Sequence, residues 1–169
     1  RGASMRFPDR GLYCITDPAL ARGRSHIEQA RLCLEGGARV IQMRDKSSPR
    51  EVLLPVARRI AALCRERDVP FVVNDDPTLA VEAGADGVHV GQDDMPPAEA
   101  RRIVGPGRLI GLSTHTRAQL LAAQRLPVDY VGFGPIFATH SKDSPYAPLG
   151  PSELAWALKT ATLPVVPIG

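Results

Sequence analysis

Polar side chains gather where short apolar runs of this chain end. The first group is Gln42-Met43-Arg44-Asp45-Lys46, within and after the run that starts at Val40. Arg44 and Lys46 lie two residues apart, so in an extended segment both side chains point the same way and can hold one anion. The alternative is that both are solvated loop charges paired with Asp45. The pattern indicates an anion clamp, with a surface ion pair as its competitor.

Two acidic turns follow later apolar runs. Asn74-Asp75-Asp76 comes after one run, and Gly91-Gln92-Asp93-Asp94 follows the next. If these runs are neighbouring strands, Asp75 and Asp94 can bind Mg²⁺, which prefers one or two carboxylates plus water and phosphate oxygens. The alternative is that the aspartates cap helices beginning near Pro77 and Pro97. One aspartate of each turn can cap a helix while the other binds the metal.

Two further segments carry hydroxyl groups suited to phosphate. The first is Ser113-Thr114-His115-Thr116, and the second is the long loop from Gly132 to Lys142, which contains Thr139, His140 and Ser141 and could also close as a lid. Neither loop histidine has a nucleophile or acid partner in the sequence, so we assign no proton transfer to them. Of the other histidines, we expect His26 on the surface at a helix start and His89 as a filler inside the barrel.

The elements that must position these groups alternate between short β-branched runs and amphipathic stretches, the pattern of βα units around a parallel sheet. The stretch from Pro49 to Arg67 is predicted to be a helix that buries Val52, Val56, Ile60, Ala61 and Cys64 on one face. A weak repeat precedes the second, fourth and sixth runs, where a helix end feeds a new strand. We expect an α/β fold of the TIM-like (β/α)8 barrel type rather than an open doubly wound sheet. Seven runs are predicted as strands: 11–16, 40–43, 71–74, 87–90, 109–113, 130–133 and 165–168.

The length of 169 residues fits a single barrel domain over 6–169. The sequence stops after the seventh run, so we expect an eighth strand and its helix to be missing and the barrel to be truncated. Residues 1–5 read as a tag or a disordered N-terminus.

Composition narrows the class of partner. No apolar run approaches the roughly 20 residues that span a bilayer, which predicts a protein without a membrane partner. The net charge of +3 is scattered among acidic neighbours, which argues against nucleic acid and fits anionic small molecules. Cys14, Cys33 and Cys64 are odd in number and lack metal-ligand spacing, so we expect buried free thiols and a cytoplasmic location.

The combination resembles thiamine phosphate synthase over essentially the whole chain in order. The segments that carry the resemblance are Gln42 to Lys46, Val73 to Asp75, Gly87 to Asp94, Ser113 to Thr116, Gly132 to Thr139, and Pro167 to Gly169. Relatives more often have Thr-x-Thr-Lys where this chain has Thr139-His140-Ser141-Lys142, and serine keeps the hydroxyl.

The resemblance implies a Mg²⁺-dependent transferase that joins hydroxymethylpyrimidine diphosphate to thiazole phosphate and releases pyrophosphate. It implies that Asp75 and Asp94 bind the metal, and that Arg44, Lys46 and Lys142 act as catalytic cations on the diphosphate. The pyrimidine diphosphate side would include Gln42, Met43, Asp45, Asn74 and Ser113, and the thiazole phosphate side Thr139, His140 and Ser141. The alternatives are a thiazole tautomerase of the same fold, which has no use for a diphosphate clamp, and a non-catalytic module that binds phosphate ligands. A homo-oligomer is left open.

Overall fold

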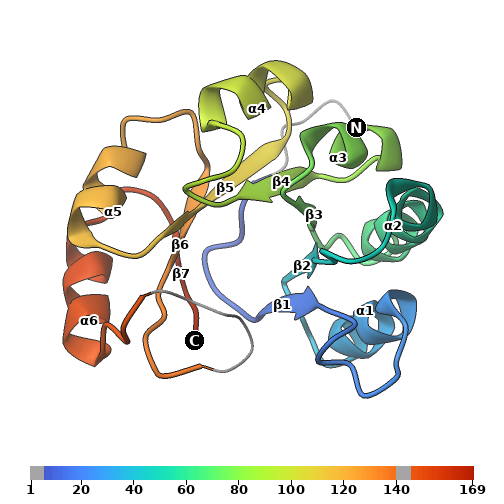
Figure 1. Cartoon of the computed structure of the whole chain (residues 1–169), viewed down its shortest axis with the longest axis horizontal. Helices are drawn as coiled ribbons and strands as arrows, with labels where there is room; N and C mark the ends of the chain where they lie inside the picture. Colours follow the sequence, from blue (N-terminus) through green and yellow to red (C-terminus); the bar gives the residue numbers. More distant parts are fainter. Residues whose placement is uncertain (1–5, 140–145) are drawn as a thin grey trace.

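The computed structural model describes residues 6–139 and 146–169, and in these ranges strands and helices alternate along the chain (Figure 1). The strands are β1 (Tyr13–Thr16), β2 (Val40–Met43), β3 (Phe71–Asn74), β4 (Gly87–Val90), β5 (Leu109–Thr114), β6 (Tyr130–Phe133) and β7 (Val165–Pro167). The helices are α1 (His26–Glu35), α2 (Arg50–Arg65), α3 (Pro77–Ala83), α4 (Pro97–Val104), α5 (Arg117–Ala123) and α6 (Pro151–Thr160). The predicted runs are confirmed as strands, four of them with the predicted bounds.

The strands form one parallel sheet in sequence order, β1 to β7, with each strand paired to the next. The sheet curves and the helices lie on its outer side, as Figure 1 shows, which is the arrangement of a TIM-like fold. Within the described residues β1 and β7 are the two edges of the sheet. The parallel order brings the carboxyl ends of all these strands to one face of the molecule.

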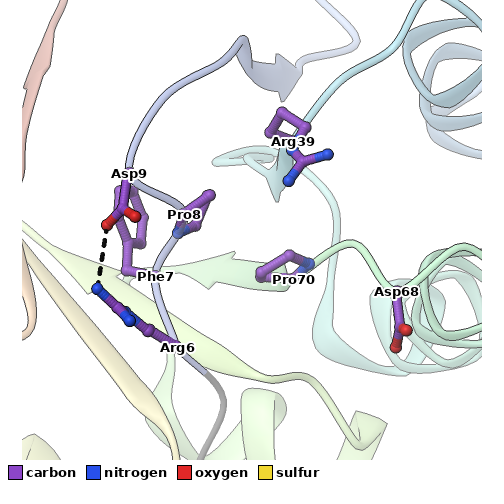
Figure 2. Close-up of a pocket in the computed structure, with 7 residues that line it drawn as sticks. All are labelled: Arg6, Phe7, Pro8, Asp9, Arg39, Asp68 and Pro70. Carbon is purple, nitrogen blue, oxygen red and sulfur yellow. Dashed lines mark hydrogen bonds and ion pairs between the residues drawn. The ribbon is translucent and has the colours of Figure 1, made fainter.

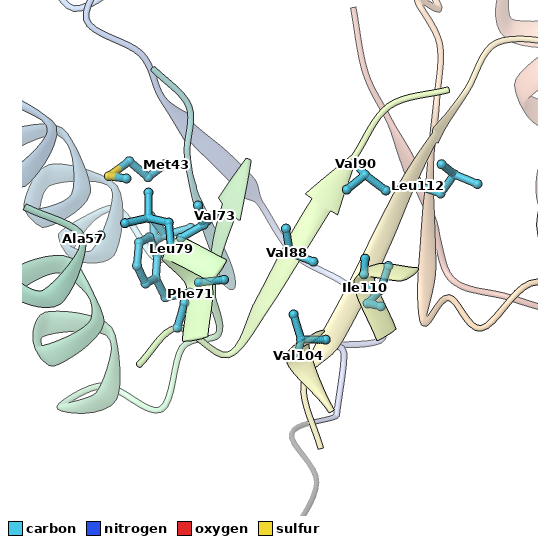
Figure 3. Packing of buried hydrophobic residues seen from close by; sticks show 14 of the residues in the cluster. Met43, Ala57, Phe71, Val73, Leu79, Val88, Val90, Val104, Ile110 and Leu112 are labelled. Carbon is cyan, nitrogen blue, oxygen red and sulfur yellow. The ribbon is translucent and has the colours of Figure 1, made fainter. Parts of the chain in front are cut away.

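Alternation along each strand separates two layers of side chains. The outward residues of β3, β4 and β5 pack under helices in an apolar layer that Figure 3 shows, with Phe71, Val73, Val88, Val90, Ile110 and Leu112 joined by Ala57, Leu79 and Val104 of the helices. The inward positions of the same sheet hold polar and aromatic groups, among them Gln42, His89 and Tyr130. The outer layer therefore carries the apolar core, and the inner layer is available for chemistry.

Two of the three occurrences of the weak sequence repeat have a structural cause at the strand entrances. Asp86 precedes β4, and its carboxylate accepts the backbone N–H of Phe71 at 3.0 Å. Asp129 precedes β6 and accepts the N–H of Ile110 in the same way at 2.7 Å. Each aspartate thus fastens the start of its strand to the start of the strand before it.

The predicted face of α2 is only partly right. Ile60, Ala61 and Cys64 are buried, but Val52 is 50% exposed and Val56 is only partly buried. Leu53 and Ala57 occupy the buried positions instead, which rotates the packed face by about one residue.

The three cysteines are free thiols, as expected, but only Cys64 is buried, while Cys14 and Cys33 are half-buried. Burial raises the pKa of the Cys64 thiol to about 12, so this group stays protonated and inert. No helix in the described ranges has the length and apolar character needed to cross a membrane.

Candidate active site

A cavity of about 470 Å³ opens among the inward side chains of the sheet and the loops that follow its strands. Its walls come from strands β1 to β7 and from segments directly after them. The lining includes five residues of the predicted site, namely Gln42, Arg44, Asn74, Ser113 and Thr139, together with Tyr13, Asp17, His89, His115 and Tyr130. The sequence prediction that these groups converge at one face is consistent with this cavity.

A smaller cavity of about 240 Å³ lies at the opposite end, where Arg39 and Pro70 precede β2 and β3 (Figure 2). Its other walls are residues 6–9 and Asp68, and Arg6 pairs with Asp9 across its rim. None of the predicted site residues lines it. In parallel βα folds the chemistry lies at the carboxyl ends of the strands, so the larger cavity is the candidate site.

The two cations of the predicted clamp are held by separate acids. Arg44 forms an ion pair with Asp17, which directly follows β1 and is almost fully buried. Lys46 Nζ lies 3.3 Å from an oxygen of Asp75. Neither cation is paired with Asp45, so the alternative of a local loop ion pair is contradicted. Arg44 and Lys46 instead face the acids that follow β1 and β3.

Asp45 is held by hydrogen bonds within its own turn. Its carboxylate accepts hydrogen bonds from the backbone N–H and hydroxyl groups of Ser47 and Ser48, at 2.7 to 3.0 Å. These bonds hold the pKa of Asp45 well below its usual range, against the opposing effect of burial. The carboxylate thereby fixes the turn that carries Lys46.

The expectation that His26 lies on the surface is wrong. The side chain is buried, with Nδ1 2.7 Å from the hydroxyl of Thr16 and Nε2 3.3 Å from Asp45. Although His26 is the first residue of α1, its side chain points back under the loop after β2. There it connects Thr16 of β1 to Asp45 of that loop. His26 is therefore part of the support beneath the cation clamp.

Asp75 and Asp94 meet at the mouths of β3 and β4. Asp75 has a left-handed backbone, φ 65°, and its N–H donates to the carbonyl of His89 at 2.8 Å. Asp94 accepts the N–H of Gly91 at 2.7 Å, and a Cβ at Gly91 would lie 2.7 Å from the same carboxylate oxygen. The glycine is therefore needed for Asp94 to fold back over its own turn. The result is two carboxylates within hydrogen-bonding reach of each other.

The proximity of these acids is unfavourable without a cation. Burial and the neighbouring Asp94 raise the pKa of Asp75, and Lys46 only partly opposes this. Within the described residues no group of three or more histidine, cysteine or acidic side chains could hold a metal. Mg²⁺ nonetheless needs only one or two carboxylates, because water and phosphate oxygens complete its coordination. The residues present fit that ion.

The helix-capping alternative is right for one turn and wrong for the other. Asp76 is the N-cap of α3, where its side chain accepts the N–H of Leu79 at 2.8 Å. The N-cap of α4 is Pro96, with no side-chain cap bond, so Asp94 is not used as a cap. In the first turn, capping falls to Asp76 and leaves Asp75 to face Asp94.

Five of the predicted site residues that the structure describes do not line the cavity, namely Met43, Asp45, Lys46, Asp75 and Asp94. Met43 is buried in the apolar layer beneath the helices (Figure 3), and Asp45 is held in its own turn. Both alternate with residues that do line the cavity, so any contact they make with a ligand would come from their backbone. His140, Ser141 and Lys142 lie outside the described residues.

Four polar side chains of the lining, those of Tyr13, Asp17, His89 and Tyr130, were not predicted to serve the site. Asp17 had a detectable signal, because it follows a strand end as Asp75 does. Tyr13, His89 and Tyr130 lie inside strands, where sequence patterns give them the appearance of core residues. His115 donates from Nδ1 to the carbonyl of Gly134 at 2.7 Å and stacks on Tyr146, with ring centroids 3.9 Å apart.

Comparison with known proteins adds an independent line of argument. The family model described as thiamine monophosphate synthase matches residues 12–169. Thiamine-phosphate synthase of Chlorobium limicola is 45% identical over 164 residues, which cover 96% of this chain and 76% of that protein. The chain also matches a thiamine biosynthesis bifunctional protein of Geobacter sulfurreducens at 44% identity, but spans only 32% of its length.

Comparison with solved structures points to the same family and fold. A thiamine phosphate pyrophosphorylase from Pyrococcus furiosus superposes with a TM-score of 0.85 at 35% identity, covering 95% of this chain and 75% of that one. A 3-dehydroquinate dehydratase from Geobacillus kaustophilus superposes with a TM-score of 0.63 at 12% identity, a likeness of fold alone.

Proposed function

Because the chain belongs to the thiamine monophosphate synthase family, we propose that its cavity joins hydroxymethylpyrimidine diphosphate to thiazole phosphate with the help of Mg²⁺. The products would be thiamine phosphate and pyrophosphate. The observation that carries the proposal is that Lys46 and Asp94 both lie against Asp75 at the mouths of β3 and β4, while Arg44, paired with Asp17, lines the cavity. This arrangement suits a diphosphate and a divalent ion together.

The chain's own groups would act mainly on the leaving group. Arg44, oriented by Asp17, and Lys46 would bind diphosphate oxygens and stabilise the charge that develops as the bond from the pyrimidine methylene to the diphosphate oxygen breaks. The thiazole nitrogen would then form the new bond to that methylene. Asp75 and Asp94 would hold Mg²⁺, which when bound would neutralise charge on the departing pyrophosphate. No protein nucleophile is required.

The remaining predicted residues divide between the two substrates. Gln42, Asn74 and Ser113 would contact the pyrimidine half, with Lys142 completing its diphosphate site. Thr139, His140 and Ser141 would form the thiazole phosphate side. The shared cavity supports the placement of the first three and of Thr139.

The test is pyrophosphate release by the purified full-length protein, with both substrates and Mg²⁺ and then with each of the three left out in turn. We expect release only when all three are present. A folded protein that releases no pyrophosphate, but isomerises a thiazole phosphate, would replace the synthase with the tautomerase. Mg²⁺-dependent binding of the diphosphate without turnover would indicate a binding module.

We also propose that the protein works in the cytoplasm. The three cysteines are free thiols, and such thiols persist in reducing compartments. Fractionation of cells producing the protein, with the activity assayed in each fraction, tests this.

A further inference from the structure

A continuous hydrogen-bonded chain crosses the interior of the sheet between two cavity walls. Gln42 Nε2 donates to the Tyr13 hydroxyl at 2.7 Å, and this hydroxyl lies 2.8 Å from that of Tyr130. The Tyr130 hydroxyl lies 3.0 Å from His89 Nδ1, and His89 Nε2 lies 2.8 Å from the Ser113 hydroxyl. We call Tyr13, Tyr130 and His89 the relay, because they connect Gln42 on β2 to Ser113 on β5.

The sequence of β5 makes room for this chain. Gly111 stands between His89 and Tyr130 in the sheet register, paired with both. A Cβ at Gly111 would lie 2.4 Å from His89 Nδ1 and 2.4 Å from the Tyr130 hydroxyl oxygen. Only glycine therefore allows the histidine and the tyrosine to meet across the intervening strand. The space at this position is an observation independent of the hydrogen bonds.

Proton counting gives the relay one direction. Each phenol carries one proton, and burial raises the pKa of Tyr13 to about 12 and raises the pKa of Tyr130 well above its ordinary value, so both phenols remain protonated. Tyr13 accepts from Gln42 and so donates to Tyr130, which in turn donates to His89 Nδ1. A neutral imidazole then carries its proton on Nε2 and donates to the Ser113 oxygen.

Gln42 and Ser113, the two ends of the hydrogen-bonded chain, both line the cavity. The direction of proton donation determines which hydrogen-bonding group each of them offers to a ligand. The Ser113 oxygen already accepts from His89, so its own proton is left to donate toward a ligand. The Gln42 amide nitrogen is used by Tyr13, so its Oε1 is left to accept. No buried side-chain oxygen or nitrogen in the described residues lacks a partner, which agrees with Oε1 reaching the cavity.

We propose that Tyr13, Tyr130 and His89 are positioning residues that make Ser113 a donor and Gln42 an acceptor, so that the cavity selects an amino-substituted nitrogen heterocycle. Such a ring offers an amine N–H to Gln42 and a ring nitrogen to Ser113. The inference rests on the proposed function and deepens it, because it states how the site distinguishes an aminopyrimidine from an oxopyrimidine, whose N–H and carbonyl groups exchange donor for acceptor.

The test measures binding rather than turnover, so that its failure is separate from failure of the synthase assay. Calorimetry on the full-length protein, with Mg²⁺, measures the dissociation constants of two compounds. They are hydroxymethylpyrimidine diphosphate with an amino group on its ring and the analogue with an oxo group in its place. We expect the native protein to prefer the amino ring. Tyr130→Phe keeps the ring that stacks on Phe7 at 4.1 Å but removes the central hydroxyl, and should reduce the preference about tenfold.

Two further variants break the relay elsewhere. Tyr13→Phe removes the link beside Gln42, and Gly111→Ala adds a methyl between His89 and Tyr130 without deleting any polar group. Gly107→Ala is the matched control for the added methyl, because nothing lies within 4 Å of a Cβ there. Tyr130→Phe, Tyr13→Phe and Gly111→Ala should each show the reduced preference while remaining folded, and Gly107→Ala should keep the native preference.

The outcomes separate the relay from ordinary packing. Loss of amino-over-oxo preference in both phenylalanine variants supports the proposal. It is overturned if they keep the native preference, if affinity for both rings falls equally, or if the native protein binds the oxo ring more tightly or neither ring.

Discussion

At the scale of single residues, each charged group of the site is set by one partner from another strand end. Arg44 depends on Asp17 and Lys46 on Asp75, so the cations are oriented before any ligand arrives. Preorganised charge is more effective than mobile charge because no reorganisation accompanies the reaction. Substituting Asp17, which orients Arg44, should therefore affect ligand binding as substituting Arg44 itself would.

Asp17→Asn should loosen Arg44. The variant keeps the shape of the side chain but removes the charge that holds the guanidinium, so we expect KM for the pyrimidine diphosphate to rise about tenfold. KM for thiazole phosphate should not change. Steady-state kinetics with each substrate varied checks this.

Asp9→Asn is the matched control for that experiment. It removes the acid of the exposed Arg6–Asp9 pair, whose side chains are 86% and 81% accessible, and should change neither constant. Equal effects of the two substitutions would contradict a positioning role for Asp17.

Asp94→Asn should separate stability from activity. The folded-state pKa of Asp75 is raised, so its contribution to stability is present below the unfolded pKa and is lost as pH rises through the folded value. Without Mg²⁺ the native protein should lose stability over that rise. The variant relieves the repulsion and should melt about 2–4 °C higher at neutral pH, the shift that about 1 kcal/mol produces in a domain of this size.

Mg²⁺ should reverse the order of the melting temperatures of the native protein and Asp94→Asn. Mg²⁺ is expected to stabilise the native protein and to have little effect on Asp94→Asn, whose turnover should fall at least about a hundredfold. Thermal melts from about pH 4 to 8, with and without Mg²⁺, check both statements. A variant that melts lower than the native protein throughout would show that Asp75 and Asp94 do not repel each other.

At the scale of elements, the aspartates at the strand entrances give a sharper stability test than the cavity does. Asp129→Ala removes the acceptor of the Ile110 N–H and the partner of Arg101, at 2.7 Å each, and leaves a strand N–H unpaired. We expect the free energy of unfolding to fall by about 1–3 kcal/mol. Asp129→Asn keeps an acceptor oxygen and should lose less. Chemical denaturation measures both, and equal losses would mean that the backbone hydrogen bond is unimportant.

The strands were the most predictable elements. The runs 40–43, 71–74, 87–90 and 130–133 match observed strands in full, because β-branched residues between glycine or aspartate boundaries leave little freedom. The face of α2 was less predictable. Apolar character shows which residues can be buried, whereas the rotation of the helix about its axis determines that Ala57 is buried and Val52 is exposed.

The site was predictable where its residues follow strand ends. Asp75 and Asp94 could be paired from sequence because parallel strands bring their ends together. The relay could not, since Tyr13 and Tyr130 are 117 residues apart and meet only through the inward face of the sheet. Nor could the burial of His26, which depends on a loop from another βα unit.

At the scale of the whole molecule, the outer layer holds the apolar core and the inner layer lines the candidate site. Ile60→Ala on the buried face of α2 should lower the free energy of unfolding by about 2–5 kcal/mol while leaving KM for both substrates unchanged. Val52→Ala on the exposed face of the same helix should change stability by less than about 0.5 kcal/mol. Denaturant melts and kinetics of both variants check the separation, which a large change of KM in Ile60→Ala would contradict.

The alternation of the two layers also constrains how the chain can fold. A strand paired one residue out of register would exchange its faces. Gln42 and His89 would then lie among apolar side chains beneath the helices, deprived of their partners, while Ile41 and Val88 would face the cavity. The polar groups that line the cavity thus also make misaligned sheets unstable, so the residues proposed to bind the ligand would also favour the correct register.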